Sequence, residues 1–106
     1  MALTRDFRET IRERAQREPA FRQALLREGL QLINDGDFAT GRGILRNYIN
    51  ATIGFPELAR ETKISSPSLQ RMFGPSGNPS AQNFFGVIAA LQKAEGVSVE
   101  LQMHTQ

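Results

Sequence analysis

Arginine is the residue type in this sequence with the most chemistry to offer. It supplies 11 of the 13 cationic side chains, although the formal net charge is only +2. The planar guanidinium donates paired hydrogen bonds, which suit phosphate groups and the base edge of guanine. Arg71 stands among short polar side chains at Ser66, Ser68 and Gln70. This combination is typical of a surface that contacts nucleic acid.

Other kinds of chemistry find little support. The chain has no cysteine, which excludes disulfides and Cys-based metal sites and fits a reducing cytoplasm, the location we predict. His104 is the single histidine and lies near the C-terminal end, a poor position for a catalytic or metal site. Asp35 and Asp37 are paired carboxylates, but their place on a turn explains them as capping groups. We therefore predict no catalytic residue, no metal, no cofactor and no enzymatic activity.

The N-terminal residues predict a charged helical arm. Leu3, Phe7, Ile11 and Ala15 recur every four residues, between groups of Arg and Glu. The simplest interpretation is a solvated helix with a thin docking stripe. The alternatives are a segment that folds onto a partner protein and direct DNA contact by the arginines. No run of about 18 apolar residues exists, so we predict no membrane span, and no apolar segment here resembles a secretory signal.

Two helices are predicted next, over residues 19–33 and 38–52. Gly36 suits the left-handed position after the first helix, Asp37 is the predicted N-cap of the second, and Gly54 is its stop signal. Arg42 and Arg46 lie one turn apart and are predicted to face away from the buried stripes. Those stripes comprise Phe21, Ala24, Leu25, Leu26, Leu30, Leu32 and Ile33 in the first helix, and Phe38, Leu45, Tyr48, Ile49 and Thr52 in the second.

Residues 54–73 predict two short helices joined by a tight turn, a helix-turn-helix. Counted from Phe55, small or apolar residues stand where two crossing helices need them, at Leu58, Ala59, Ile64, Leu69 and Met72. Ser65 is the predicted N-cap of the second helix, and Pro67 lies in its first turn. The inner apolar positions would hold the second helix at its crossing angle, so that its other face can enter a DNA groove.

The outward face of that second helix is the predicted DNA-reading surface. Its outward positions are Ser66, Pro67, Gln70 and Arg71, with Ser68 near the DNA backbone. Arg71 could bond the O6/N7 edge of guanine, Gln70 could read adenine or a phosphate, and the serines suit phosphates or close base approach. Lys63 and Ser65, which border the helix, complete the predicted DNA-binding residues of this segment.

The remainder of the chain predicts a loop, a helix and a strand. Residues 74–79 are dense in turn residues. Ser80 caps a predicted helix over residues 81–94, whose buried stripe is Ala81, Phe84, Phe85, Ile88 and Leu91, and Gly96 ends it. Residues 97–103 alternate in the strand period. Since a lone strand cannot satisfy its backbone, it would pair with a second copy, with another protein or with a local strand; a frayed tail is the alternative.

The motifs of this region resemble a known family. The residues that carry the resemblance are Gly54-Phe55-x-x-Leu58-Ala59-x-x-Thr62, Ser66-x-Ser68-Leu69-x-Arg71-Met72 and Gly77-Asn78-Pro79. Over roughly residues 38–101 the chain is similar to the addiction-module antidote proteins, the HigA-type antitoxins with a Xre/Cro-like helix-turn-helix. Lys63 stands where that family often has a turn glycine, so either it takes left-handed geometry or the turn differs.

The resemblance implies a fold and a function. The fold is all-α, a five-helix Xre/Cro-like domain with an N-terminal helical arm and a short C-terminal β-strand. The arm and support helix would occupy residues 1–36 and the DNA-binding domain residues 37–106. The function is that of a bacterial repressor, a homodimer on the palindromic operator of its own operon and the antitoxin of a RelE/ParE-type toxin. Asn78 would lie near the DNA backbone. The alternatives are a regulator without a toxin and a protein-interaction module with the helix-turn-helix as scaffold.

Overall fold

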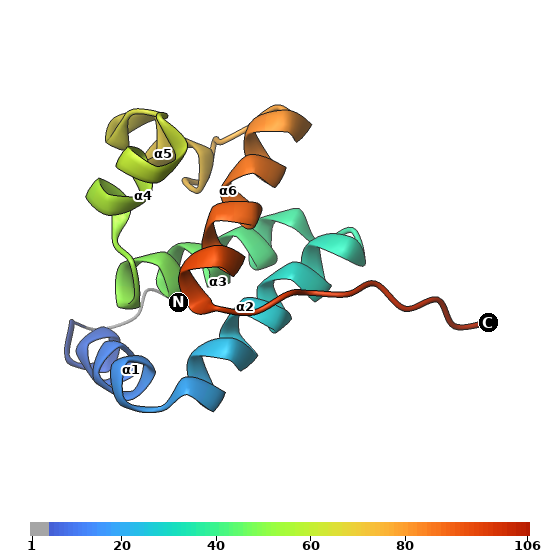
Figure 1. The fold of residues 1–106 in the computed structure, drawn as a ribbon, viewed down its shortest axis with the longest axis horizontal. Helices are drawn as coiled ribbons and strands as arrows, with labels where there is room; N and C mark the ends of the chain where they lie inside the picture. The colour runs from blue at the N-terminus through green and yellow to red at the C-terminus, as the bar shows by residue number, and fades with distance from the viewer. Residues whose placement is uncertain (1–4) are drawn as a thin grey trace.

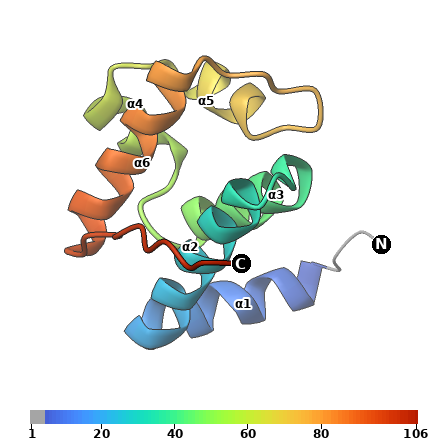
Figure 2. The ribbon, with the colours of Figure 1, turned by 90° about the vertical axis from the view of Figure 1, so that its right-hand side faces the viewer.

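The computed structural model describes residues 5–106, which form six helices and no strand. The helices are α1 (Arg5–Arg17), α2 (Pro19–Asn34), α3 (Phe38–Ala51), α4 (Phe55–Thr62), α5 (Ser66–Met72) and α6 (Ala81–Glu95). Figures 1 and 2 show α1 at one end of the molecule, α2 and α3 in the middle, and α4 with α5 at the other end. The predicted all-α class is confirmed.

Local sequence signals determine where these helices begin and end. The side chains of three predicted N-caps accept a backbone hydrogen bond: Asp37 from Thr40 at 3.2 Å, Ser65 from Ser68 at 3.3 Å and Ser80 from Asn83 at 3.1 Å. All three predicted glycine stops, Gly36, Gly54 and Gly96, have positive φ. The caps and stops predicted from the sequence are therefore confirmed.

Two glycines let α2 and α3 cross closely. A Cβ atom on Gly41 would lie 2.6 Å from the carbonyl oxygen of Gly29 and 2.6 Å from Cγ1 of Ile33. A Cβ on Gly29 would lie 2.8 Å from the Leu45 side chain. Because real Cβ atoms do not approach other atoms this closely, the crossing needs glycine, and above all Gly41, which faces backbone.

One hydrophobic core joins the middle of the molecule to the α4–α5 end. It contains Leu26, Leu45, Tyr48, Ile49, Phe55, Leu58, Leu69, Met72, Phe73, Phe84, Val87, Ile88 and Leu91. The stripe predicted for α6 is partly wrong. Val87 is fully buried, whereas Phe85 is 65% exposed and Ala81 is exposed. Positions 84, 87, 88 and 91 follow the helical repeat, and position 85 lies outside that face.

The first helix is attached at its C-terminal half. Ala15 is fully buried and Ile11 half-buried, while Phe7 is exposed. The guanidinium of Arg14 lies 4.2 Å from the ring centre of Phe21, a cation–π contact that links α1 to α2. Leu3, the first residue of the predicted stripe, lies outside the described residues. The stripe therefore docks through its second half.

The predicted C-terminal strand is wrong. Residues 97–106 contain no strand, and their tail projects away from the helices (Figure 1). Its base is held where Val97 packs against the core and the Val99 amide donates to Oε1 of Gln92 at 2.8 Å. Alternation gives a chain two faces, but a strand also needs a neighbouring strand, and residues 5–96 supply only helices and turns.

Among residues 5–106, no helix is both long and apolar enough to cross a membrane.

Candidate nucleic-acid interface

The α4–α5 pair has the compact turn that its sequence predicts. Helix α4 ends at Thr62, and its C-cap Lys63 takes left-handed geometry with φ 60° and ψ 24° and donates its amide to the carbonyl of Ala59 at 2.8 Å. Ile64 and Ser65 then lead directly into α5. Of the two possibilities for Lys63, the left-handed one is confirmed. This conformation costs about 1–2 kcal/mol in a residue with a Cβ atom, so the surrounding packing must compensate.

The inner face of this pair anchors α5. Leu58 and Leu69 are fully buried, Met72 is 9% exposed, and Ala59 and Ile64 pack against the same core. Phe55 and Phe73 flank the pair with ring centres 6.4 Å apart. The inner positions predicted for the helix-turn-helix are confirmed, and α5 is held firmly although it has only seven residues.

The outer face of α5 carries the predicted reading residues. Pro67, Gln70 and Arg71 are exposed, and Ser66 and Ser68 are half-buried. Arg71 donates to the hydroxyl of Ser68 at 3.1 Å, and the Gln70 amide lies 3.4 Å from the hydroxyl of Ser66. Both contacts are exposed to solvent, so the Arg71 and Gln70 side chains can exchange them for a ligand at little net cost.

A hollow of about 690 Å³ lies beside this face, between α5, the 74–79 loop and α3. It brings together five of the predicted residues: Pro67, Ser68, Gln70, Arg71 and Asn78. The other three, Lys63, Ser65 and Ser66, do not line it. Lys63, Ser65 and Asn78 are exposed. The predicted surface is therefore split between this hollow and the turn before α5.

Arg46 of α3 also lines the hollow, and sequence reasoning missed it. Its side chain is exposed and stands near the loop and the end of α5. Between residues 64 and 80 the only charged side chain is Arg71. The second cation of this region thus comes from a helix that precedes the helix-turn-helix, and no local motif marks it.

Arg42, one turn before Arg46, is a second correction. It was predicted to face away from the buried stripe, but it is only 9% exposed. Its guanidinium donates to the carbonyls of Gly77 at 2.8 Å and Pro75 at 3.0 Å and lies 5.1 Å from the ring centre of Phe38. The loop that provides these carbonyls is more than 30 positions away in the sequence, so helical periodicity could not reveal the contact.

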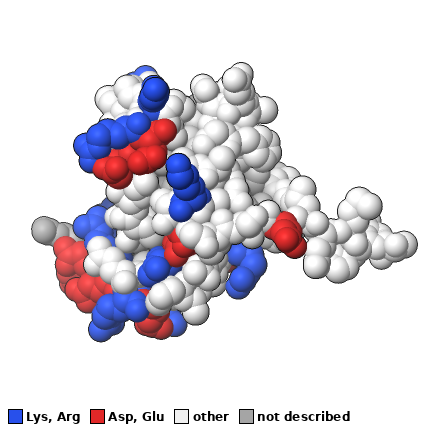
Figure 3. All heavy atoms as spheres, viewed as in Figure 1, with Lys and Arg blue, Asp and Glu red and all other residues white. Residues whose placement is uncertain are grey.

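On the side of the molecule shown in Figure 3, the charged side chains form no single basic face. Figure 3 shows Lys and Arg mixed with Asp and Glu around the lower helices and near the top, with a large uncharged area on the right. In α4, Arg60 is paired with Glu57. A DNA-binding surface here would have Lys63, Arg46 and Arg71 as its main cations, so few phosphates could be neutralised by each chain.

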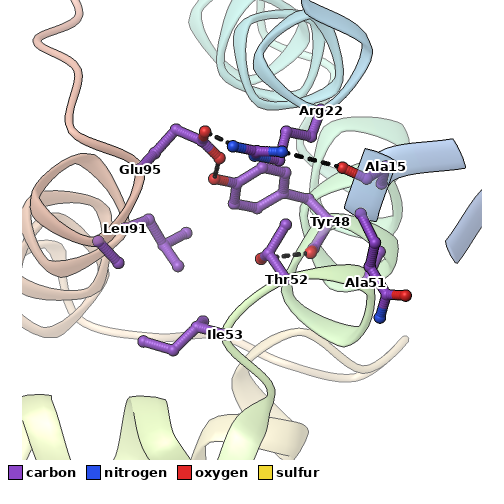
Figure 4. Close-up of a pocket in the computed structure, with 10 residues that line it drawn as sticks. Ala15, Arg22, Tyr48, Ala51, Thr52, Ile53, Leu91 and Glu95 are labelled. Atoms are coloured by element: carbon purple, nitrogen blue, oxygen red, sulfur yellow. Dashed lines mark hydrogen bonds and ion pairs between the residues drawn. The ribbon is translucent and has the colours of Figure 1, made fainter. Parts of the chain in front are cut away.

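A second hollow, of about 450 Å³, lies where α1, α2, α3 and α6 meet (Figure 4). Glu95 accepts from the Tyr48 hydroxyl at 2.5 Å and from Arg22 at 2.7 Å, and Arg22 also donates to the carbonyl of Ala15 at 3.2 Å. Burial, followed by the bond to Glu95, raises the pKa of Tyr48. The side chains of Arg22, Tyr48, Thr52 and Glu95 each have a partner within the fold, which favours a structural role.

Comparison of the chain with protein-family models, with curated proteins and with solved structures gives no match.

Proposed function

We propose that the protein is a sequence-specific DNA-binding transcriptional regulator. The observation that carries the proposal is the division of α5 into two faces. Leu69 and Met72 are buried, while Pro67, Gln70 and Arg71 are exposed beside a hollow. A short helix anchored on one side and polar on the other, after a tight turn, suits entry into the major groove.

In this proposal the exposed side chains divide their tasks. Arg71 bonds the O6/N7 edge of a guanine, and Gln70 bonds an adenine or a phosphate. Arg46, Lys63 and Asn78 contact the DNA backbone, together with the serines near the start of α5. Ser65 differs from the other serines because its hydroxyl caps α5 by accepting a hydrogen bond from the Ser68 amide. Its contribution to DNA binding is therefore mainly to fix the start of α5.

The small number of cations supports a homodimer on a palindromic site. With three main cations per chain, one copy would release few counterions, so its affinity would be low. Two copies would double the phosphate contacts and place two recognition helices about 34 Å apart, one turn of DNA. Log–log plots of affinity against salt should then have a slope of about −3.6, from four phosphate-contacting cations, Arg46 and Lys63 of each copy, at about −0.9 each.

The finer proposal is an antitoxin that represses its own operon and binds a RelE/ParE-type toxin. It is supported by the resemblance of residues 38–101 to the addiction-module antidote proteins. A regulator without a toxin would have the same DNA surface. Co-expression with an adjacent toxin-like gene distinguishes the two: an antitoxin restores growth and co-purifies with that gene's product, whereas a plain regulator does neither.

One observation favours a second candidate, a protein-interaction module. The tail exposes Leu101 by 85% and Met103 by 98%, and exposed apolar side chains are available to a partner. In that case the protein would bind the product of a neighbouring gene tightly and would not bind DNA specifically even at low salt.

The DNA-binding proposal is tested by selection from a pool of randomised duplexes, followed by fluorescence anisotropy on the selected site. Arg71→Ala should weaken binding by about 1–3 kcal/mol and relax the preference for guanine at one position of each half-site. Arg27→Ala removes an exposed arginine of α2, distant from α5, and is the matched control. A selection that enriches no sequence would overturn the proposal, and wild-type affinity of Arg71→Ala would remove Arg71 from the reading role.

A further inference from the structure

The 74–79 loop depends on a side chain from another element. Within the loop, the Gly77 amide donates to the carbonyl of Gly74 at 3.0 Å, and the Gly74 amide donates back to Arg71 at 3.1 Å. Two of its residues are prolines, which have no N–H group to donate. The carbonyls of Pro75 and Gly77 accept from the Arg42 guanidinium. Arg42 therefore provides the loop's main connection to α3.

The loop also packs tightly against the end of α5. A Cβ atom on Gly77 would collide with the carbonyl oxygens of Arg71 and Met72. Gly77 is thus held from two sides, by α5 backbone and by Arg42 (α3 lies below the loop in Figure 2). A change on either side must displace the residues that follow, beginning with Asn78.

Those residues form one wall of the hollow beside α5. Ser76, Gly77 and Asn78 line it together with Arg46 and Arg71. The position of the loop therefore decides whether the Asn78 amide can approach the same phosphate strand as the Arg46 guanidinium.

We propose that Arg42 is a positioning residue of the DNA interface. It holds the 74–79 loop so that Asn78 contacts a backbone phosphate next to the one that Arg46 contacts from α3, and it does not touch the DNA. The inference rests on the proposed function and adds a residue outside the helix-turn-helix to it. Lysine could not replace Arg42, because a single ammonium lacks the planar fork that serves two carbonyls at once.

The experiment is a double-mutant cycle on the selected DNA site, with Arg42→Met, Asn78→Ala and the double variant. Each single substitution should weaken binding about tenfold, the value of one or two hydrogen bonds. In the Arg42→Met background, Asn78→Ala should have almost no further effect, because the displaced loop no longer brings Asn78 to its phosphate. If Arg42 only stabilised the fold, the two effects would multiply, and this inference would be wrong.

The salt dependence separates positioning from direct contact. Arg42→Met should keep the wild-type log–log slope, whereas the control Arg46→Ala should reduce its magnitude by about 0.9 for each phosphate that is no longer neutralised. An equal reduction for Arg42→Met would mean that Arg42 itself neutralises a phosphate, and the positioning role would be overturned.

Gly77→Ala provides a second route if Arg42→Met does not fold. It displaces the loop from the α5 side and leaves every charge in place, so it should also weaken binding and suppress the effect of Asn78→Ala. If Gly77→Ala binds as wild type, the loop does not matter and the inference fails while the proposed function stands. If the wild-type protein selects no DNA sequence, the proposed function fails and this inference fails with it.

Discussion

At the scale of single residues, a few side chains join helices that are distant in the sequence. Glu95, whose side chain is 2% exposed, accepts from Tyr48 of α3 and Arg22 of α2, and Arg22 reaches the end of α1. Arg42 does the same between α3 and the 74–79 loop. Such bonds are strong because one partner is charged and water is largely excluded.

The titration of Tyr48 reports on the Glu95 cluster. Burial and the bond to Glu95 raise the pKa of the phenol above its unfolded value of about 10. The folded state therefore prefers the protonated form, and its contribution to stability is complete below about pH 10 and is lost as the pH rises further. Tyr48 is the only tyrosine, so tyrosinate absorbance reports this group alone. We expect no tyrosinate at about pH 11 until the protein unfolds.

Two variants complete that measurement. In Tyr48→Phe, the free energy of unfolding should fall less between about pH 9 and pH 11 than in wild type, because the ionising group is absent. Glu95→Gln should lower the pKa of Tyr48 relative to wild type, since the carboxylate acceptor and its charge are removed. Ionisation of Tyr48 near pH 10 in a protein that stays folded would contradict the structural role of the cluster.

At the scale of elements, the crossing of α2 and α3 depends on the absence of side chains. Gly41 faces the backbone of Gly29 and the side chain of Ile33, and the helices can approach only because no Cβ atom lies between them. A glycine inside a helix normally lowers stability by about 0.5–1 kcal/mol relative to alanine. Its presence here indicates that the close approach of the two helices stabilises the protein by more than this cost.

Gly41→Ala should therefore destabilise the protein despite the better helix propensity of alanine. We expect a loss of about 1–3 kcal/mol in the free energy of unfolding, measured by urea denaturation, because the helices must separate. Gly43→Ala is the matched control. Gly43 lies in the same helix, and a Cβ atom there meets nothing within 4 Å, so this variant should be neutral or slightly more stable. Equal effects of the two substitutions would contradict a tight crossing at Gly41.

At the scale of the whole molecule, the helices and the tail play different parts. The core links α2 to α6, whereas the chain beyond Val99 is exposed and extends away from the helices. Removal of residues 100–106 should change the free energy of unfolding by less than about 0.5 kcal/mol, as for other exposed sites. Removal of residues 97–106 should lower the free energy of unfolding by a larger amount, since Val97 packs against the core.

The same truncations test what the tail contributes to assembly. Sedimentation equilibrium on the full chain measures whether the proposed homodimer forms, and the 100–106 truncation shows whether the tail holds it together. If the helices form the dimer, the truncated protein keeps the dimer mass. If it becomes monomeric, its stability should no longer depend on protein concentration, whereas its binding to a palindromic site should depend more steeply on concentration, because two separate copies must then bind.

The sequence by itself determined the features that depend on neighbours within a few positions. Asp37, Ser65 and Ser80 cap their helices, Gly36 and Gly96 end theirs, and Leu58 and Leu69 hold α5, all as predicted. Caps, turns and the inner face of a helix-turn-helix are local, because the groups that interact are at most about a dozen residues apart.

Only the tertiary structure decided which faces meet and which segments remain unpaired. Arg42 turns inward because a distant loop presents two carbonyls to it. The alternating tail forms no strand because the described chain has no second strand beside it. These outcomes depend on partners brought together by folding, and periodicity within one segment contains no information about them.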